Sequence, residues 1–326
     1  MLAPTSVHYA IETPSIFAPV SSPAFAIRDL SFFVLAITAA IFVIVAGLAA
    51  YTLIRFGRRR AEPEIEPAQV YGSNQVEIAW TVIPMLIVFA LFLASARVIT
   101  GVQNADRPAG TVDVIAIGHQ FWWEYRYPAL GVVTANELHV PVSDPARPTP
   151  TFITLLSADT DHSFWIPRLG GKTDLIPNQV NRTWIDPYEV GLYLGQCAQY
   201  CGTQHAKMLL RVYVDSRDVF DSWVRQQHEP ARQQADVAEG KQLFLRTACI
   251  NCHAVSGTAA TGQFGPDLTH LMSRDTIAAG ISPNTVENLR AWIRDPESIK
   301  PGSRMPAIKL TDPELDSVTA YLATLR

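Results

Sequence analysis

Two long apolar segments near the amino terminus constrain the fold of this chain more than any other feature. The first runs from Leu30 to Ile54 without a charged residue, and the second runs from Ile78 to Ala96 between Glu77 and Arg97. Each is close to the ~20 residues that an α-helix needs to cross a hydrocarbon layer of about 30 Å. A buried core helix is the alternative, but such helices seldom lack charges over this length. We therefore predict a hairpin of two membrane-spanning helices, with Pro84 as a kink in the second.

The loop between the predicted spans sets the orientation of the chain. It begins with Arg55 and continues through Arg58, Arg59 and Arg60. Basic residues in short loops favour the cytoplasmic side of a membrane. Both ends of the chain, and everything after about residue 101, are therefore expected on the periplasmic or extracellular side.

Beyond the second span, the chain divides into a strand-rich part, a polar connector and a helix-rich part. Short segments of apolar residues, several alternating with polar ones and separated by Pro and Gly, predict a β-sandwich or barrel. Later segments repeat apolar residues at helical spacing. The predicted strands lie at 112–117, 121–127, 152–156, 182–185, 192–194 and 209–214, and the predicted helices at 239–246, 285–294 and 313–325. With a net charge of −4 and 17% charged residues, the chain offers no basic face for a nucleic acid.

Two of the four cysteines form a CxxCH element at Cys249, Cys252 and His253. This element attaches a c-type haem through two thiols and supplies one imidazole to the iron. A redox-active or zinc-binding CxxC is the alternative, but the adjacent histidine and the predicted export of the domain argue against it. For the second axial ligand, Met305 is the better choice because it lies in a turn before the last predicted helix. Met272 lies in an apolar segment, where packing is the usual role of methionine.

The other two cysteines, Cys197 and Cys201, are followed on the same segment by His205 and Met208. A local disulfide is the alternative, but it would not account for the histidine and the methionine. Thiolate, imidazole and thioether together form a soft ligand set that favours copper. Two thiolates can also bridge two metal ions, and His162 is the natural second imidazole because it lies between predicted strands of the same domain.

These motifs carry a resemblance to a known family. Residues 25–215 resemble cytochrome c oxidase subunit II, and residues 236–326 resemble class I cytochromes c. The resemblance implies a multidomain membrane protein with a transmembrane hairpin, a cupredoxin domain as the β-sandwich or barrel, and an α-helical class I cytochrome c domain. It rests on EIAWTVIP at 77–84, DHSF at 161–164, the CxxxCxxxHxxM loop at 197–208, GKQLF at 240–244 and GPDL at 265–268.

The expected domain boundaries follow from this resemblance. They are an N-terminal segment at 1–28, the hairpin at 29–100 with spans at about 30–54 and 78–98, the cupredoxin domain at 101–216, a linker at 217–238 and the cytochrome domain at 239–326.

The resemblance also implies the cofactors and their ligands. A binuclear copper centre, CuA, would be bound by His162, Cys197, the backbone carbonyl of Gln199, Cys201, His205 and Met208. Haem c would be attached to Cys249 and Cys252, with His253 and Met305 as axial ligands. The family usually has glutamate where Gln199 stands, and its carboxylate helps to bind magnesium against subunit I. A neutral amide is a weaker ligand for this hard cation, which weakens the case for a magnesium site.

Two further positions are interpreted through the resemblance. Phe121 stands where the family has the tryptophan that receives electrons, so electrons are expected to enter through Phe121 or Trp122. An aromatic strand that packs on the sandwich is the alternative. Glu77 resembles a glutamate at the mouth of a proton pathway, but an acid at a helix N-terminus also simply favours the helix dipole.

The function that the resemblance implies is electron transfer within a terminal oxidase. Electrons would pass from the fused haem to CuA and then to haem in subunit I, where oxygen is reduced to water with proton translocation. The catalytic oxygen site lies outside this chain. Expected partners are subunit I, subunit III, an external cytochrome c or other reductase, and the lipid of a bacterial plasma membrane. A CuA-containing nitric oxide reductase subunit and a stand-alone membrane-anchored electron carrier are the alternatives.

Overall fold

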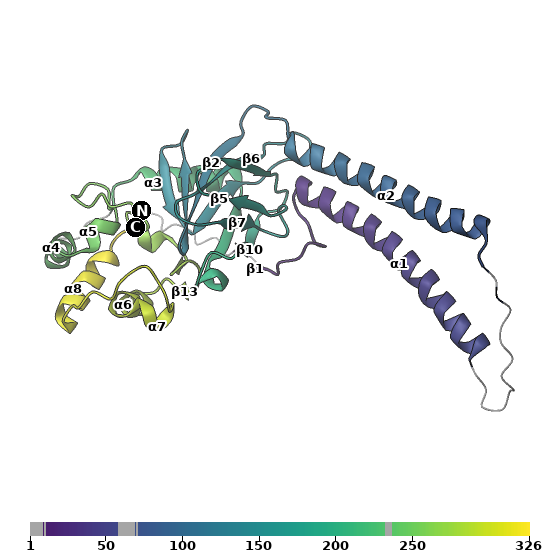
Figure 1. Cartoon of the computed structure of the whole chain (residues 1–326). Helices are drawn as coiled ribbons and strands as arrows, with labels where there is room; N and C mark the ends of the chain where they lie inside the picture. The colour runs from purple at the N-terminus through teal and green to yellow at the C-terminus, as the bar shows by residue number, and fades with distance from the viewer. Residues whose placement is uncertain (1–8, 10, 58–68, 70, 232–236) are drawn as a thin grey trace. The chain divides into compact units, whose positions relative to one another are not determined.

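The computed structural model describes the chain except for residues 1–8, 10, 58–68, 70 and 232–236 (Figure 1). The chain forms two compact units. One holds residues 25–105, and the other holds residues 1–24 together with residues 106–326. The apolar segments belong to the first unit and all four cysteines belong to the second.

Two long helices, α1 (Ser22–Phe56) and α2 (Asn74–Gln103), account for the first unit. Both are long and apolar enough to cross a membrane, and no residue of either apolar window is buried. A helix that is apolar and exposed all round suits surroundings of lipid and other protein. Pro84 lies inside α2, and the helix continues past it. Arg58 to Arg60, on which the predicted orientation partly rests, lie outside the described residues.

The β domain, residues 106–228, contains two sheets that share one apolar core. The strand order is β4-β3-β2-β6-β9 in one sheet and β5-β11-β10-β7-β8 in the other, with β1 added beside β10. The strands are β1 (Ile11–Glu12), β2 (Val112–His119), β3 (Trp122–Tyr127), β4 (Val132–Ala135), β5 (Glu137–Pro141), β6 (Thr151–Ser157), β7 (His162–Trp165), β8 (Thr173–Leu175), β9 (Asn181–Ile185), β10 (Gly191–Cys197) and β11 (Leu209–Asp215).

Alternation of buried and less buried residues along the strands explains this architecture. In β2, Val114 and Ala116 face the core while their neighbours are less buried. In β3, Trp123 and Tyr125 are fully buried in the same core. Buried residues from both sheets form this one core, which confirms the predicted β-sandwich or barrel. The short strands β4, β5, β7 and β8 were not predicted, because segments of three to five residues carry too little alternation to recognise.

The first half of the expected linker is a helix, α3 (Arg217–His228). Its Phe220 is buried in the core of the β domain, and Trp223 and Val224 pack against that core. The apolar residues are spaced for one helical face, so the polar composition of this stretch conceals an amphipathic helix.

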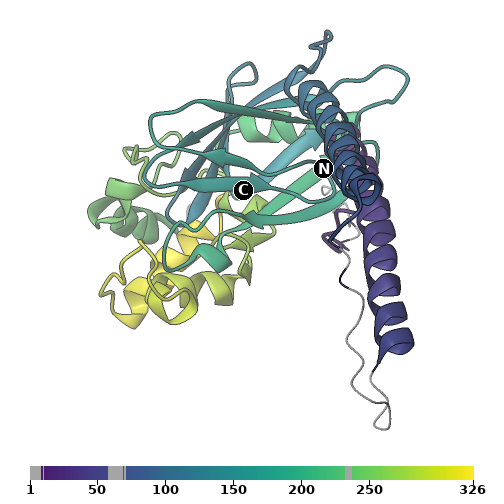
Figure 2. The ribbon, with the colours of Figure 1, turned by 45° about the vertical axis from the view of Figure 1, so that its right-hand side comes forward.

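The C-terminal domain, residues 237–326, is built from short helices around a second apolar core (Figure 2). Its last helix begins with a capping box between Thr311 and Glu314, which satisfies backbone N–H groups that the helix start would leave free. The helices are α4 (Ala238–Arg246), α5 (Cys249–Cys252), α6 (Val286–Arg294), α7 (Pro296–Ile299) and α8 (Asp312–Leu322), with a small hairpin of β12 (Thr276–Ile277) and β13 (Ser282–Pro283).

Candidate metal centre and haem pocket

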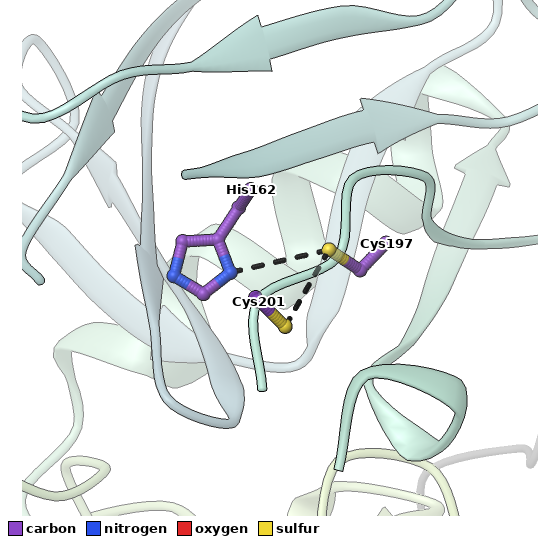
Figure 3. Close-up of side chains that lie close together, drawn as sticks. All are labelled: His162, Cys197 and Cys201. Carbon is purple, nitrogen blue, oxygen red and sulfur yellow. Dashed lines mark hydrogen bonds between the residues drawn. The ribbon is translucent and has the colours of Figure 1, made fainter. Parts of the chain in front are cut away.

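Strand pairing brings His162 to Cys197, and the loop after β10 adds Cys201 to the same cluster. Cys197 ends β10 and pairs with Phe164 of the neighbouring β7, which begins at His162. The ligand atoms of His162, Cys197 and Cys201 all lie within 4.8 Å of one another (Figure 3). Cys197 Sγ lies 3.9 Å from His162 Nδ1 and 3.9 Å from Cys201 Sγ. All three side chains are buried, so this is an enclosed cluster of soft ligands.

The remaining predicted ligands come from the loop after β10. Cys201 Sγ lies 3.8 Å from His205 Nδ1 and 3.9 Å from Met208 Sδ. The backbone oxygen of Gln199 lies 3.2 Å from Cys197 Sγ. The loop is closed because the Cys197 N–H donates to the Met208 carbonyl at 3.0 Å. The structure therefore brings all six predicted ligands to one place.

This donor set fits copper and does not form a disulfide. Both cysteines are free, and their sulfurs are 3.9 Å apart, well beyond a disulfide bond of about 2.05 Å. His162 is oriented by Asp159, whose Oδ1 lies 2.8 Å from Nε2, leaving Nδ1 toward the sulfurs. Gly118 leaves room for this ring, because a Cβ there would lie 2.7 Å from His162 Cδ2. Two sulfurs, two imidazoles, a thioether and a carbonyl suit a pair of copper ions.

Cys197, Cys201 and His162 change one another's tendency to ionise. The contact with Cys201 lowers the pKa of the Cys197 thiol to about 3, and the same contact raises the pKa of the Cys201 thiol. Burial disfavours the charged form of His162, but hydrogen bonds with Asp159 and Cys197 outweigh it and raise the pKa of His162. The lowered pKa of Cys197 favours the thiolate, which is the form that metals require.

The CxxCH element opens onto a cavity in the same unit. Cys249, Cys252, His253 and Met305 all line this cavity, whereas Met272 packs beside the core of the C-terminal domain. The His253 ring lies with Nδ1 2.8 Å from the Pro266 carbonyl, which leaves Nε2 for a metal. Burial lowers the pKa of His253, so the imidazole is held in its neutral, ligating form.

Arg274 is a further residue of the cavity, and its role was not predicted from the sequence. The guanidinium of Arg274 is buried, lines the cavity and donates through Nη2 to the Asp267 carbonyl at 2.6 Å. Its Nε has no partner among the described residues. An orphaned buried donor of this kind fits an acidic group of a bound cofactor, such as a haem propionate. No local pattern marks a lone arginine for this role.

Phe121 contacts both the cavity and the loop of the metal cluster, whereas Trp122 is shown only on the cavity side. Both are buried and line the cavity. The Phe121 ring also packs closely against Gly202, the residue after Cys201. A Cβ atom added to Gly202 would lie only 3.1 Å from this ring. Trp122 stacks on His119 with ring centroids 4.2 Å apart. Glu77 belongs to the other unit, where it lies exposed in the first turn of α2.

Three family models match the chain in succession. Residues 10–98 match the transmembrane domain of cytochrome c oxidase subunit II, residues 132–217 match its periplasmic domain, and residues 237–326 match cytochrome c. Among solved structures, the periplasmic domain of subunit II of cytochrome oxidase from Bradyrhizobium japonicum is 29% identical and covers 37% of this chain and 96% of its own, with a TM-score of 0.35.

Curated relatives match over nearly the whole chain. Cytochrome c oxidase subunit 2 of Alkalihalophilus pseudofirmus is 35% identical over 302 residues, covering 89% of this chain and 84% of the relative. The subunit 2 of a Bacillus species is 36% identical over 293 residues, covering 83% and 80%. The chain therefore belongs to the cytochrome c oxidase subunit II family, in the form that carries a cytochrome c domain joined to its C-terminus.

Proposed function

We propose that this chain delivers electrons to a terminal oxidase of a bacterial plasma membrane, taking them from an external cytochrome c or another reductase. Family membership makes it a two-pass membrane subunit of a haem-copper oxidase, an oxidoreductase, in complex with subunit I. Its cofactors are a binuclear copper centre and haem c. Subunit III is proposed as a further partner. The observation that most directly supports electron transfer between the two sites is that Phe121 lines the haem cavity and also packs on the loop of the metal cluster.

The residues that hold the two cofactors are proposed from the geometry above. Haem c would be bonded to Cys249 and Cys252 and ligated by His253 and Met305. The copper pair would be held by His162, Cys197, the Gln199 carbonyl, Cys201, His205 and Met208. When bound, these groups supply one-electron oxidation and reduction. The protein contributes an imidazole at His253 whose lowered pKa favours the neutral form, a thiol at Cys197 whose lowered pKa favours the thiolate, and burial of the Cys197 side chain.

Electrons are proposed to enter the copper site through Phe121 or Trp122. A cytochrome domain in the same chain presents its haem at high effective concentration. The demands on a docking surface for a mobile donor are then relaxed, which agrees with phenylalanine at the position where the family has tryptophan. Gln199 is proposed to contribute only its backbone carbonyl, since its side chain is exposed and carries no charge for a magnesium ion.

The orientation and the proton pathway are proposed from the hairpin. The basic loop that begins at Arg55 favours the cytoplasmic side, which leaves both termini and the metal sites on the periplasmic or extracellular side. Glu77 is proposed to stand at the mouth of a proton pathway that leads into subunit I.

The decisive experiment is gas consumption by the complex, purified through a tag on this chain and supplied with an artificial reductant. Rapid oxygen uptake is expected. Rapid uptake of nitric oxide with little oxygen uptake would instead place the chain in a nitric oxide reductase. Uptake of neither gas, with both cofactors bound, would favour a stand-alone electron carrier.

A further inference from the structure

The β domain and the C-terminal domain meet through two buried ionisable side chains. Glu137 opens β5 in the β domain, and Lys300 follows α7 in the C-terminal domain. Each residue is only 3% exposed. Neither is a predicted ligand of copper or haem, although Lys300 lies at the edge of the haem cavity, and both make contacts with the other domain.

Glu137 binds the first residues of the small hairpin in the C-terminal domain. Its carboxylate accepts hydrogen bonds from the Asp275 N–H at 3.1 Å, the Thr276 N–H at 2.9 Å and the Thr276 hydroxyl at 2.8 Å. Beside it, the Tyr213 hydroxyl of β11 donates to Asp275 at 2.7 Å. One carboxylate thus satisfies three donors across the boundary between the domains.

Lys300 makes the matching contact in the opposite direction. Its Nζ donates to the carbonyl of Phe121 in the β domain at 2.8 Å and to the carbonyl of Ala278 at 3.2 Å. Burial lowers the pKa of Lys300 to about 7. An amine keeps two N–H groups, so both hydrogen bonds survive loss of the proton.

The segment after Lys300 carries Met305 and rests on the segments that flank the metal cluster. The Pro301 carbonyl accepts a hydrogen bond from the Gln204 amide. Gly302 packs closely against Thr203. A Cβ atom added to Gly302 would lie 3.1 Å from the Cβ of Thr203. Arg304 donates to the Gln120 side chain. The proposed axial ligand of the haem is therefore tied to residues beside the proposed copper ligands.

These contacts differ from those of a transient electron-transfer complex. Glu137 and Lys300 bind backbone and hydroxyl groups of the other domain, and every ion pair recorded between described residues lies within a single domain or within the hairpin. Salt screens exposed charge pairs at separations beyond about 8 Å at physiological ionic strength, whereas buried hydrogen bonds are screened much less. Such an interface should persist at salt concentrations that separate charge-steered partners.

We propose that Glu137 and Lys300 are positioning residues that hold the C-terminal domain in one docked orientation, with the haem cavity closed against Phe121. Electron transfer between the two sites then needs no diffusional search by the cytochrome domain. The rate consequence rests on the proposed function, but the docked geometry does not.

The test uses the whole oxidase complex with Glu137→Ala or Lys300→Met in this chain. Hydrogen–deuterium exchange would be followed at both contacts. Each variant is expected to lose protection at the contact it leaves intact: residues 300–304 in Glu137→Ala and residues 275–277 in Lys300→Met. The controls are Glu287→Ala and Lys309→Met, which change exposed residues of the C-terminal domain away from both contacts. Tyr213→Phe is a milder variant that removes one hydrogen bond of the same interface, and a smaller loss is expected.

A second measurement is the rate of electron transfer from the haem to the copper pair. After rapid reduction of the haem, one electron leaves the iron and one is gained by the copper pair, so the two absorption changes must match. In the unmodified complex, this rate is expected to be independent of ionic strength. In Glu137→Ala and Lys300→Met it is expected to fall at least tenfold and to become salt-dependent, while haem attachment and copper content stay unchanged.

Exchange confined to the mutated contact, with a rate within twofold of the controls, would overturn the proposal. If protection is lost across both contacts but the unmodified complex transfers no electron from haem to copper, the docking stands and the proposed function fails. The experiment therefore distinguishes failure of the docking proposal from failure of the proposed function.

Discussion

A methionine in a small helical domain is usually packing material, and Met305 and Met272 differ chiefly in where the fold places them. Met305 lines the cavity that also holds Cys249, Cys252 and His253. Met272 packs beside the apolar core. Position in the tertiary structure, and not residue type, selects the proposed axial ligand.

Met305→Leu should therefore keep the covalent haem but lower its reduction potential, since His/Met ligation raises the potential. The drop is expected to be about 0.1 V or more, within the roughly 0.8 V that axial ligands span. A redox titration followed by haem absorbance measures it. Met272→Leu is the matched control, and a larger drop there than in Met305→Leu would contradict the assignment.

Glu124 illustrates how hydrogen bonds overcome burial. Burial favours the neutral acid, but His119 at 3.0 Å and Arg126 at 2.5 Å bind the carboxylate and lower the pKa of Glu124 below its usual 4.5. A carboxylate with a lowered folded-state pKa contributes stability above the unfolded-state pKa, and loses it as pH falls through the folded-state pKa.

The chain with Glu124→Gln should accordingly be less stable than the natural chain near neutral pH, and the difference should shrink as pH falls below about 4.5. Denaturant unfolding of the purified chain in detergent, followed by tryptophan fluorescence, measures the free energy of unfolding. Glu239→Gln, at an exposed position of α4, is the control. A difference that grows on acidification would refute this account.

At the scale of elements, the metal cluster belongs to a loop that extends the β10–β11 hairpin. The last paired residues are Gln196 and Leu209, and the loop between them is closed by the Cys197 N–H on the Met208 carbonyl. Gly202 lies at φ +128° against the Phe121 ring. The turn therefore needs both a left-handed backbone conformation and the absence of a side chain.

Gly202→Ala should shift this loop and lower the copper content of the complex. The backbone strain and the contact with Phe121 together should cost about 1–3 kcal/mol. Gly257→Ala is the control, because Gly257 also has positive φ, at +73°, but faces open space. Copper analysis and copper absorbance are the measurements. Equal copper content in both variants would show that the contact with Phe121 is unimportant.

At the scale of the whole molecule, the described residues of the transmembrane unit form no apolar core of their own. Neither apolar window of α1 or α2 contains a buried residue. Two exposed apolar helices are stable only in lipid or against another subunit. We therefore propose that the hairpin contacts subunit I and the bilayer, with Glu77 at the start of α2 facing that complex.

Glu77→Gln should reduce steady-state oxygen uptake severalfold and leave haem and copper content unchanged. The reason is that an amide cannot release or accept the proton that a carboxyl group carries. Oxygen uptake by the purified complex measures the effect, and Gln75→Ala in the same helical turn is the control. Unchanged uptake in Glu77→Gln would reduce this residue to a favourable charge at the helix N-terminus.

The sequence by itself determined the features that depend on local spacing. The spans are continuous apolar runs, CxxCH fits within five residues, and Cys197 to Met208 lie on one loop, so each motif already contains most of its chemistry. The short strands were missed because a few residues carry little periodicity, and α3 was placed in a linker because its composition is polar.

Only the tertiary structure decided which distant residues meet. Pairing of β7 with β10 brings His162 to Cys197, and packing of the two domains in the second unit sets Phe121 between the haem cavity and the metal loop. Arg274, Glu137 and Lys300 carry no local signal, because a buried charged residue is identified by what surrounds it. Those surroundings come from segments far apart in the chain, and they exist only once the chain has folded.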